Sequence, residues 1–185
     1  MHERELHEQK LREESSGNAT AHQSVERNPA RYAATGDPVS SAAVVAGANG
    51  AARIAASSDA EAVAQWLAEF RASPQTLRAY RREAERLLLW LEHQGRRLDQ
   101  LRRQDLDAFE SFLASPTPRH LWVGPPRPRH APDWRPFRGP LSPASRRQSL
   151  VILQGMFAWL VEAGWVAHNP FRLMRDKRRR FDNRR

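Results

Sequence analysis

The sequence contains no cysteine among its 185 residues. Disulfide scaffolds, thiolate zinc sites, iron–sulfur clusters and cysteine nucleophiles are therefore excluded. The seven histidines are scattered without the paired spacing of a metal site, so we expect no metal and no other cofactor. No run of 18 apolar residues occurs, and the charged start MHERELHEQKLREE lacks the apolar centre of a signal peptide. We therefore expect a cytoplasmic protein that makes no membrane contact.

Lysine is nearly absent, because only Lys10 and Lys177 occur among the 30 basic residues and arginine supplies the rest. The net charge is +9, and its distribution is uneven. Residues 1–56 hold 6 basic and 7 acidic side chains, whereas residues 57–185 hold 24 basic and 14 acidic ones. The planar guanidinium suits phosphates and base edges, so the bias favours a nucleic-acid partner. A genome rich in G and C produces the same bias, and composition alone does not separate the two explanations.

Large apolar side chains are rare in residues 1–56, which are rich in Ala, Ser, Gly and Asn. Such a segment cannot bury enough surface to offset the entropy of ordering it. We predict that residues 1–56 are disordered, apart from a weak Ala-rich helix over 42–56. The length of the chain then leaves room for one domain.

Four later segments have the apolar spacing of amphipathic helices, and no segment resembles a strand. The first begins after Ser58, which fits a capping box with Glu61, and ends near Phe70 or Arg71. The third spans roughly residues 104–114. These patterns predict an all-α bundle.

Ser-Pro pairs open the two longer helices, at Ser73-Pro74 and Ser142-Pro143, where serine is a good N-cap and proline fits the first turn. We expect the helices to span 74–94 and 143–163 and to be followed by Gly95 and Gly164. The polar face of the earlier one carries Arg78, Arg81, Arg82, Glu85 and Arg86. The later one is apolar nearly all round, which predicts a central helix or one covered by another domain.

Residues 115–141 contain eight prolines, so no helix is expected there. The segment also carries Trp122, Trp134 and Phe137, which could stack on nucleic-acid bases. Aromatic residues in a long loop more often form a small core beneath it, and we favour that interpretation.

Three motifs occur together in a characteristic order. Ser-Pro-Gln-Thr-Leu-Arg-Ala-Tyr opens one helix, Leu-Ser-Pro-Ala-Ser-Arg-Arg-Gln-Ser-Leu opens another, and that helix closes on a hydrophobic turn followed by Asn169-Pro170. In this order the chain resembles the N-terminal SAM-like, or core-binding, domain of tyrosine recombinases (phage-type integrases) over roughly residues 57–180. The Thr and Tyr of the family's first DNA-reading helix correspond to Thr76 and Tyr80. The Trp-Val-Gly-Pro and Pro-Asp-Trp-Arg-Pro-Phe loop also resembles an insertion found in a bacterial integrase subgroup.

The resemblance implies an orthogonal four- to five-helix bundle over 57–171, with the Pro-rich insertion at 115–141 and a basic tail at 172–185. It also implies that this module binds double-stranded DNA at a recombination half-site, with further recombinase protomers as partners. Two helices would enter the groove and the tail would cross the backbone. The DNA-binding residues implied in this way are Gln75, Thr76, Arg78, Arg81, Arg82, Ser145, Arg146, Arg147, Gln148, Gln154, Lys177, Arg178, Arg179 and Arg180. Relatives commonly have Arg at the positions of Gln148 and Gln154, so base preference would differ there.

Several of these residues also have simpler explanations. The arginines after Pro74 could balance Glu83 and Glu85 on a solvated helix face, and the tail could be a solubilising run. A rival function is a helical protein–protein interaction module, supported by an expected apolar outer face of Ile152, Met156 and Trp159. Salt separates the two functions, because DNA binding weakens steeply with ionic strength.

The family's chemistry requires a separate catalytic domain with two Arg, a Lys, a His-x-x-Arg pair and a Tyr nucleophile. We expect that domain to be absent, because the sequence stops at Arg185 and its only tyrosines are Tyr32 and Tyr80. The segment His93-Gln94-Gly95-Arg96 matches His-x-x-Arg by accident, since it lies at a helix end with no Tyr after it. The chain is therefore expected to bind DNA without cleaving it.

Overall fold

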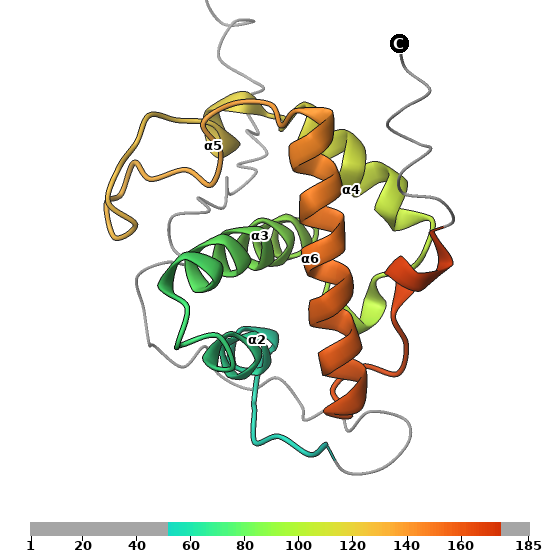
Figure 1. Ribbon diagram of the computed structural model, residues 1–185. Helices are drawn as coiled ribbons and strands as arrows, with labels where there is room; N and C mark the ends of the chain where they lie inside the picture. The colour runs from blue at the N-terminus through green and yellow to red at the C-terminus, as the bar shows by residue number, and fades with distance from the viewer. Residues whose placement is uncertain (1–51, 175–185) are drawn as a thin grey trace, which may run out of the picture.

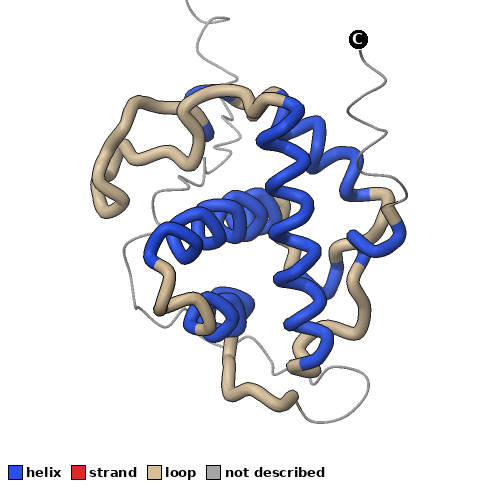
Figure 2. Tube along the Cα trace, in the orientation of Figure 1, coloured by secondary structure: helices blue, strands red, loops and turns tan. Residues whose placement is uncertain are grey.

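The computed structural model describes residues 52–174, and this part of the chain is helical (Figures 1 and 2). Its elements are α2 (Asp59–Ala68), α3 (Pro74–His93), the 3-10 helix η2 (Leu98–Gln100), α4 (Asp105–Ala114), α5 (Arg119–Trp122), α6 (Pro143–Glu162) and the 3-10 helix η3 (Pro170–Leu173). Within residues 52–174 the only strand-like pairing is an isolated parallel bridge between Val123 and Phe137. The predicted all-α fold is confirmed. The predicted disorder before residue 52 and the basic run Lys177–Arg180 lie outside the described residues.

Helix α6 is the centre of the bundle and crosses α3, while α2, α4 and η3 also pack against it (Figure 1). Leu150, Leu153, Phe157 and Leu160 are fully buried in it, as the main apolar stripe predicted. Ile152 and Met156, expected on an outer face, are 8% and 0% exposed. Trp159, the third residue of the expected outer face, is half-buried. The expectation was therefore wrong for Ile152 and Met156, because neighbouring elements cover them.

The helix ends follow the sequence signals with three differences. Ser58 accepts a hydrogen bond from the Glu61 amide at 3.2 Å, but the Glu61 carboxylate accepts from the Ser57 amide at 2.7 Å rather than from Ser58. Ser142 caps α6 through the Ser145 amide at 3.2 Å. Ser73 does not cap α3, because its hydroxyl is hydrogen-bonded to that of Thr76 at 2.8 Å. Helix α2 ends at Ala68, earlier than predicted.

Two glycines end the long helices as expected. Gly95 follows α3 with φ of +66°, and Gly164 follows α6 with φ of +71°. This left-handed conformation has no steric cost for glycine, which explains why both helices end there. The weak helix proposed for 42–56 has no helical residue within 52–56, and the rest of it is outside the described residues.

The Pro-rich insertion has more structure than expected. It contains the one-turn helix α5, although we expected no helix between residues 115 and 141. Trp122 and Phe137 are 1% and 0% exposed, so they form a core beneath the loop, as we favoured. Trp134, the third aromatic residue, is only half-buried. The Phe137 amide donates to the Trp122 carbonyl at 3.0 Å and holds the two ends of the insertion together.

The helical body also includes the first residues of the predicted tail. Met174 is 6% exposed and belongs to the hydrophobic core, whereas Arg172 is exposed. Arg172 lies within η3, and the predicted basic tail therefore begins inside the packed part of the chain. None of the helices between residues 52 and 174 is long and apolar enough to cross a membrane.

Candidate nucleic-acid interface

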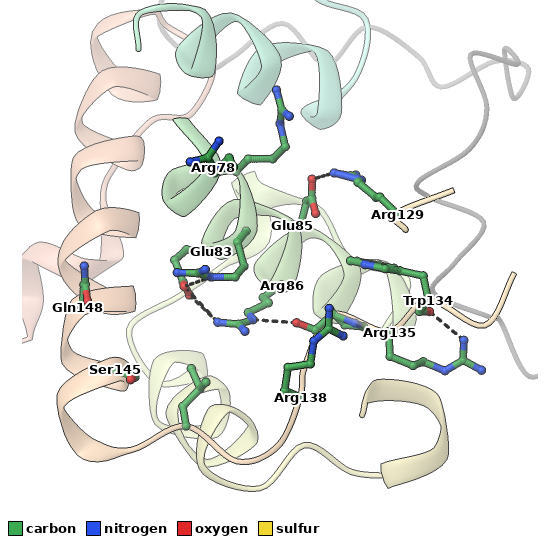
Figure 3. Close-up of a pocket in the computed structure, with 14 residues that line it drawn as sticks. Arg78, Glu83, Glu85, Arg86, Arg129, Trp134, Arg135, Arg138, Ser145 and Gln148 are labelled. Atoms are coloured by element: carbon green, nitrogen blue, oxygen red, sulfur yellow. Dashed lines mark hydrogen bonds and ion pairs between the residues drawn. The ribbon is translucent and has the colours of Figure 1, made fainter. Parts of the chain in front are cut away.

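A cleft of about 520 Å³ lies where the N-terminal half of α3, the insertion and the start of α6 meet (Figure 3). Figure 3 shows Ser145 and Gln148 of α6 on one side and Arg129, Trp134 and Arg135 of the insertion on the other. The cleft is lined by Arg78, Arg81, Arg82, Glu83, Glu85, Arg86, Arg129, Trp134, Arg135, Pro136, Arg138, Leu141, Ser145 and Gln148. Its lining holds seven arginines and two glutamates, which gives a net charge of +5.

Glu83 is engaged by arginines of its own helix. Its carboxylate forms an ion pair with Arg86 at 3.0 Å, in which both side chains are buried, and another with the exposed Arg82 at 3.2 Å. The Arg86 Nε also donates to the Pro136 carbonyl at 3.1 Å, and its guanidinium lies 4.5 Å from the centre of the Phe137 ring. We predicted Arg86 on an exposed face. The structure contradicts this, because the insertion covers that turn of α3.

Burial lowers the pKa of Arg86, since a charged group loses hydration there. The carboxylate of Glu83 opposes this shift, whereas the positive charges of Arg82 and Arg138 add to it. The lowered pKa therefore reflects mainly the burial of the guanidinium, and the two neighbouring positive charges contribute less.

Glu85, the second carboxylate, forms an ion pair with Arg129 of the insertion. The Arg129 guanidinium also lies 5.7 Å from the centre of the Trp134 ring. Burial lowers the pKa of Arg129, and the nearby charge of Arg81 lowers it further. Both carboxylates of the cleft are thus occupied by arginines.

Other arginines keep their charge without a carboxylate partner. Arg78 and Arg81 are exposed on α3 and form no ion pair within residues 52–174. Arg138 donates to the carbonyl oxygens of Pro125 and Gly124 at 2.9 and 3.4 Å, and carbonyls orient a guanidinium without neutralising it. These three side chains account for most of the excess charge.

The structure brings together five of the residues implied by the resemblance. Those that line the cleft are Arg78, Arg81, Arg82, Ser145 and Gln148. Gln75 and Thr76 lie one turn before them, where Gln75 is exposed. Arg146 and Arg147 are half-buried outside the cleft lining, and Arg146 donates to the Leu141 carbonyl at 2.7 Å.

Gln154 lies further along α6, outside the cleft lining, and its carbonyl accepts from the Asn169 side chain at 3.0 Å. The tail residues Lys177, Arg178, Arg179 and Arg180 are outside the described residues.

Six lining residues come from the insertion: Arg129, Trp134, Arg135, Pro136, Arg138 and Leu141. None of them belonged to the set of DNA-binding residues implied by the resemblance. The sequence did contain a signal for a basic surface in the insertion, because residues 115–141 contain five arginines and no lysine. Within residues 52–174, no group of three His, Asp or Glu side chains could hold a metal ion.

Residues 63–117 match the family model described as "Phage integrase, N-terminal SAM-like domain". The family resemblance is confirmed. The matched segment begins within α2 and ends just after α4, and the helices of the described residues fit the all-α SAM-like fold. Residues 63–117 are therefore similar to a recombinase-related module of the integrase type. No match was found among curated proteins or among solved structures.

Proposed function

We propose that this chain is a DNA-binding core-binding module of a tyrosine-type site-specific recombinase and grips one side of a recombination half-site. The observation that carries the proposal is the cleft of net charge +5 between α3 and α6. A duplex presents closely spaced phosphates, and arginines that neutralise them release counterions, which supplies most of the affinity. The SAM-like match supports the same conclusion.

The two long helices have different roles in this proposal. Helix α3 offers Arg78 and Arg81 to phosphates, while Ser145 and Gln148 on the first turns of α6 can hydrogen-bond base edges. Gln148 is exposed and its amide matches the donor and acceptor pattern of adenine. Sequence reading would therefore rest more on α6 and affinity more on α3.

We further propose that this chain does not cleave DNA. Tyr80 is half-buried, and its ring stacks on that of Trp66 with centroids 5.4 Å apart. It also packs edge to face with the Phe70 ring, with centroids 4.7 Å apart. A tyrosine packed in this way stabilises the contact between α2 and α3 and is poorly placed to attack a phosphodiester.

The test is the affinity of the full chain for a short labelled duplex, measured by fluorescence anisotropy over a range of salt concentrations. We expect log affinity to fall linearly with log salt, with a slope of about −0.9 for each phosphate neutralised. Replacing Arg78 and Arg81 together by Ala should flatten that slope. The double variant Arg97→Ala with Arg102→Ala is the matched control, because both side chains are exposed and lie outside the cleft lining.

The proposal would be contradicted by an affinity that does not change with salt concentration. Equal slopes of log affinity against log salt for the two double variants would also contradict it. Salt-independent capture of a protein instead of DNA would favour the rival interaction module. Ile152 and Met156, two of the three residues on which that rival rested, are buried, and the third, Trp159, is half-buried, so the rival has less support than the DNA-binding proposal.

A further inference from the structure

The Pro-rich insertion is fixed to α3 by one buried contact, one half-buried ion pair and a buried ring. The Arg86 side chain of α3 donates to the Pro136 carbonyl at 3.1 Å, and Glu85 of α3 pairs with Arg129 of the insertion. Phe137 is fully buried beneath Arg86. These contacts make the insertion a wall of the cleft with a defined position relative to α3.

This wall presents a positive charge that no carboxylate of the described residues offsets. Arg138 is exposed and lines the cleft, and its two hydrogen bonds go to the carbonyls of Gly124 and Pro125. Its charge reaches Arg86, whose pKa it helps to lower. Glu83 and Glu85 are already paired with arginines. The repulsion among the remaining positive charges is therefore reduced only when an anion binds from outside.

The chemistry of the site favours a phosphodiester. Guanidinium groups form charge-assisted, often bidentate hydrogen bonds to phosphate oxygens. The two carbonyls hold the Arg138 side chain in one orientation before the ligand arrives, which reduces the entropy lost on binding. Arg78 and Arg81 offer the same chemistry from the α3 wall.

We propose that the insertion is a second DNA-binding wall, in which Arg138 contacts a backbone phosphate of the duplex held by α3. The inference rests on the proposed function and extends it beyond the segment that matches the integrase family, which ends at residue 117. The contact is to phosphate, so it strengthens binding to every duplex and reads no sequence.

The experiment compares Arg138→Gln with Arg127→Gln in the full chain, using the same salt-dependent anisotropy measurement. Arg127 lies in the same insertion but outside the cleft lining, where it pairs with Asp133 at 2.6 Å. Both variants remove one positive charge, and Gln at 138 can still donate to a carbonyl. We expect Arg138→Gln to weaken binding to all duplexes about tenfold at low salt and to flatten the slope by about 0.9. Arg127→Gln should keep the parent slope.

A further variant, Arg138→Lys, separates charge from loop structure. Lysine keeps the charge, so the variant should recover most of the salt slope that Arg138→Gln loses. If Arg138→Gln binds with the parent slope while the parent binds duplex DNA, the inference is overturned and the proposed function stands. If the parent binds no duplex at low salt, the proposed function fails, and the inference fails with it.

Discussion

Helices α3 and α6 begin with the same Ser-Pro pair and have the same length of 20 residues, yet they have different structural roles. The C-terminal half of α3 is buried nearly all round, from Arg86 to Leu91, whereas its N-terminal half exposes Arg78, Arg81 and Arg82. Helix α6 is enclosed on most sides, and Val151, at 56% exposed, is its one large apolar side chain in solvent. The comparison teaches that α6 is the support of the bundle, whereas α3 presents charge from that support.

The boundary between these roles lies at Glu83 and Arg86, where the charged face of α3 enters the protein. Their ion pair is buried, with side chains 6% and 8% exposed, and the insertion closes over it. A buried ion pair stabilises the folded state little more than apolar residues of similar volume would. Removing one partner is costly, because it leaves the other charge buried without compensation. The position of the exposed arginines of α3 therefore depends on the ion pair between Glu83 and Arg86.

The largest expected effect comes from Glu83→Ala, which leaves Arg86 buried without its carboxylate. We expect the free energy of unfolding to fall by about 3–5 kcal/mol, measured by urea denaturation followed by circular dichroism. The control is Arg82→Ala, which removes the exposed partner of the same carboxylate and should cost at most about 1 kcal/mol. Equal losses in the two variants would show that the buried pair does not anchor α3.

The next effect tests whether α6 is enclosed. Met156→Ala removes a fully buried side chain and should lower the free energy of unfolding by about 2–5 kcal/mol. Val151→Ala, earlier on the same helix and mostly exposed, should change it by less than about 0.5 kcal/mol. A neutral Met156→Ala would restore the apolar outer face and with it the rival docking function.

Helix positions were predictable because their signals are local. Ser142, Gly95 and Gly164 act through neighbouring residues, so the starts and ends of α3 and α6 were placed within a residue or two. The arginines of α3 that face the cleft were predictable for the same reason, since helical spacing places them on one face. Ser73 shows the limit of local reasoning, because its hydroxyl bonds to Thr76 and leaves the amides uncapped.

The rest of the site depends on contacts between distant parts of the chain. Arg86 meets the carbonyl of Pro136, which is 50 residues away, and Glu85 meets Arg129, which is 44 residues away. Helical periodicity carries no information about such pairs. The burial of Arg86 and the insertion's share of the cleft therefore became visible only in the folded molecule.

The central claim is that duplex DNA occupies the cleft between α3, α6 and the insertion. The most direct test is modification of the full chain with an arginine-specific reagent, with and without bound duplex, read residue by residue by mass spectrometry. The account predicts that DNA protects Arg78, Arg81 and Arg138 while Arg97 and Arg102 react equally in both states. Unchanged reactivity of the three cleft arginines in the bound state, or protection confined to the two outside it, would contradict the account.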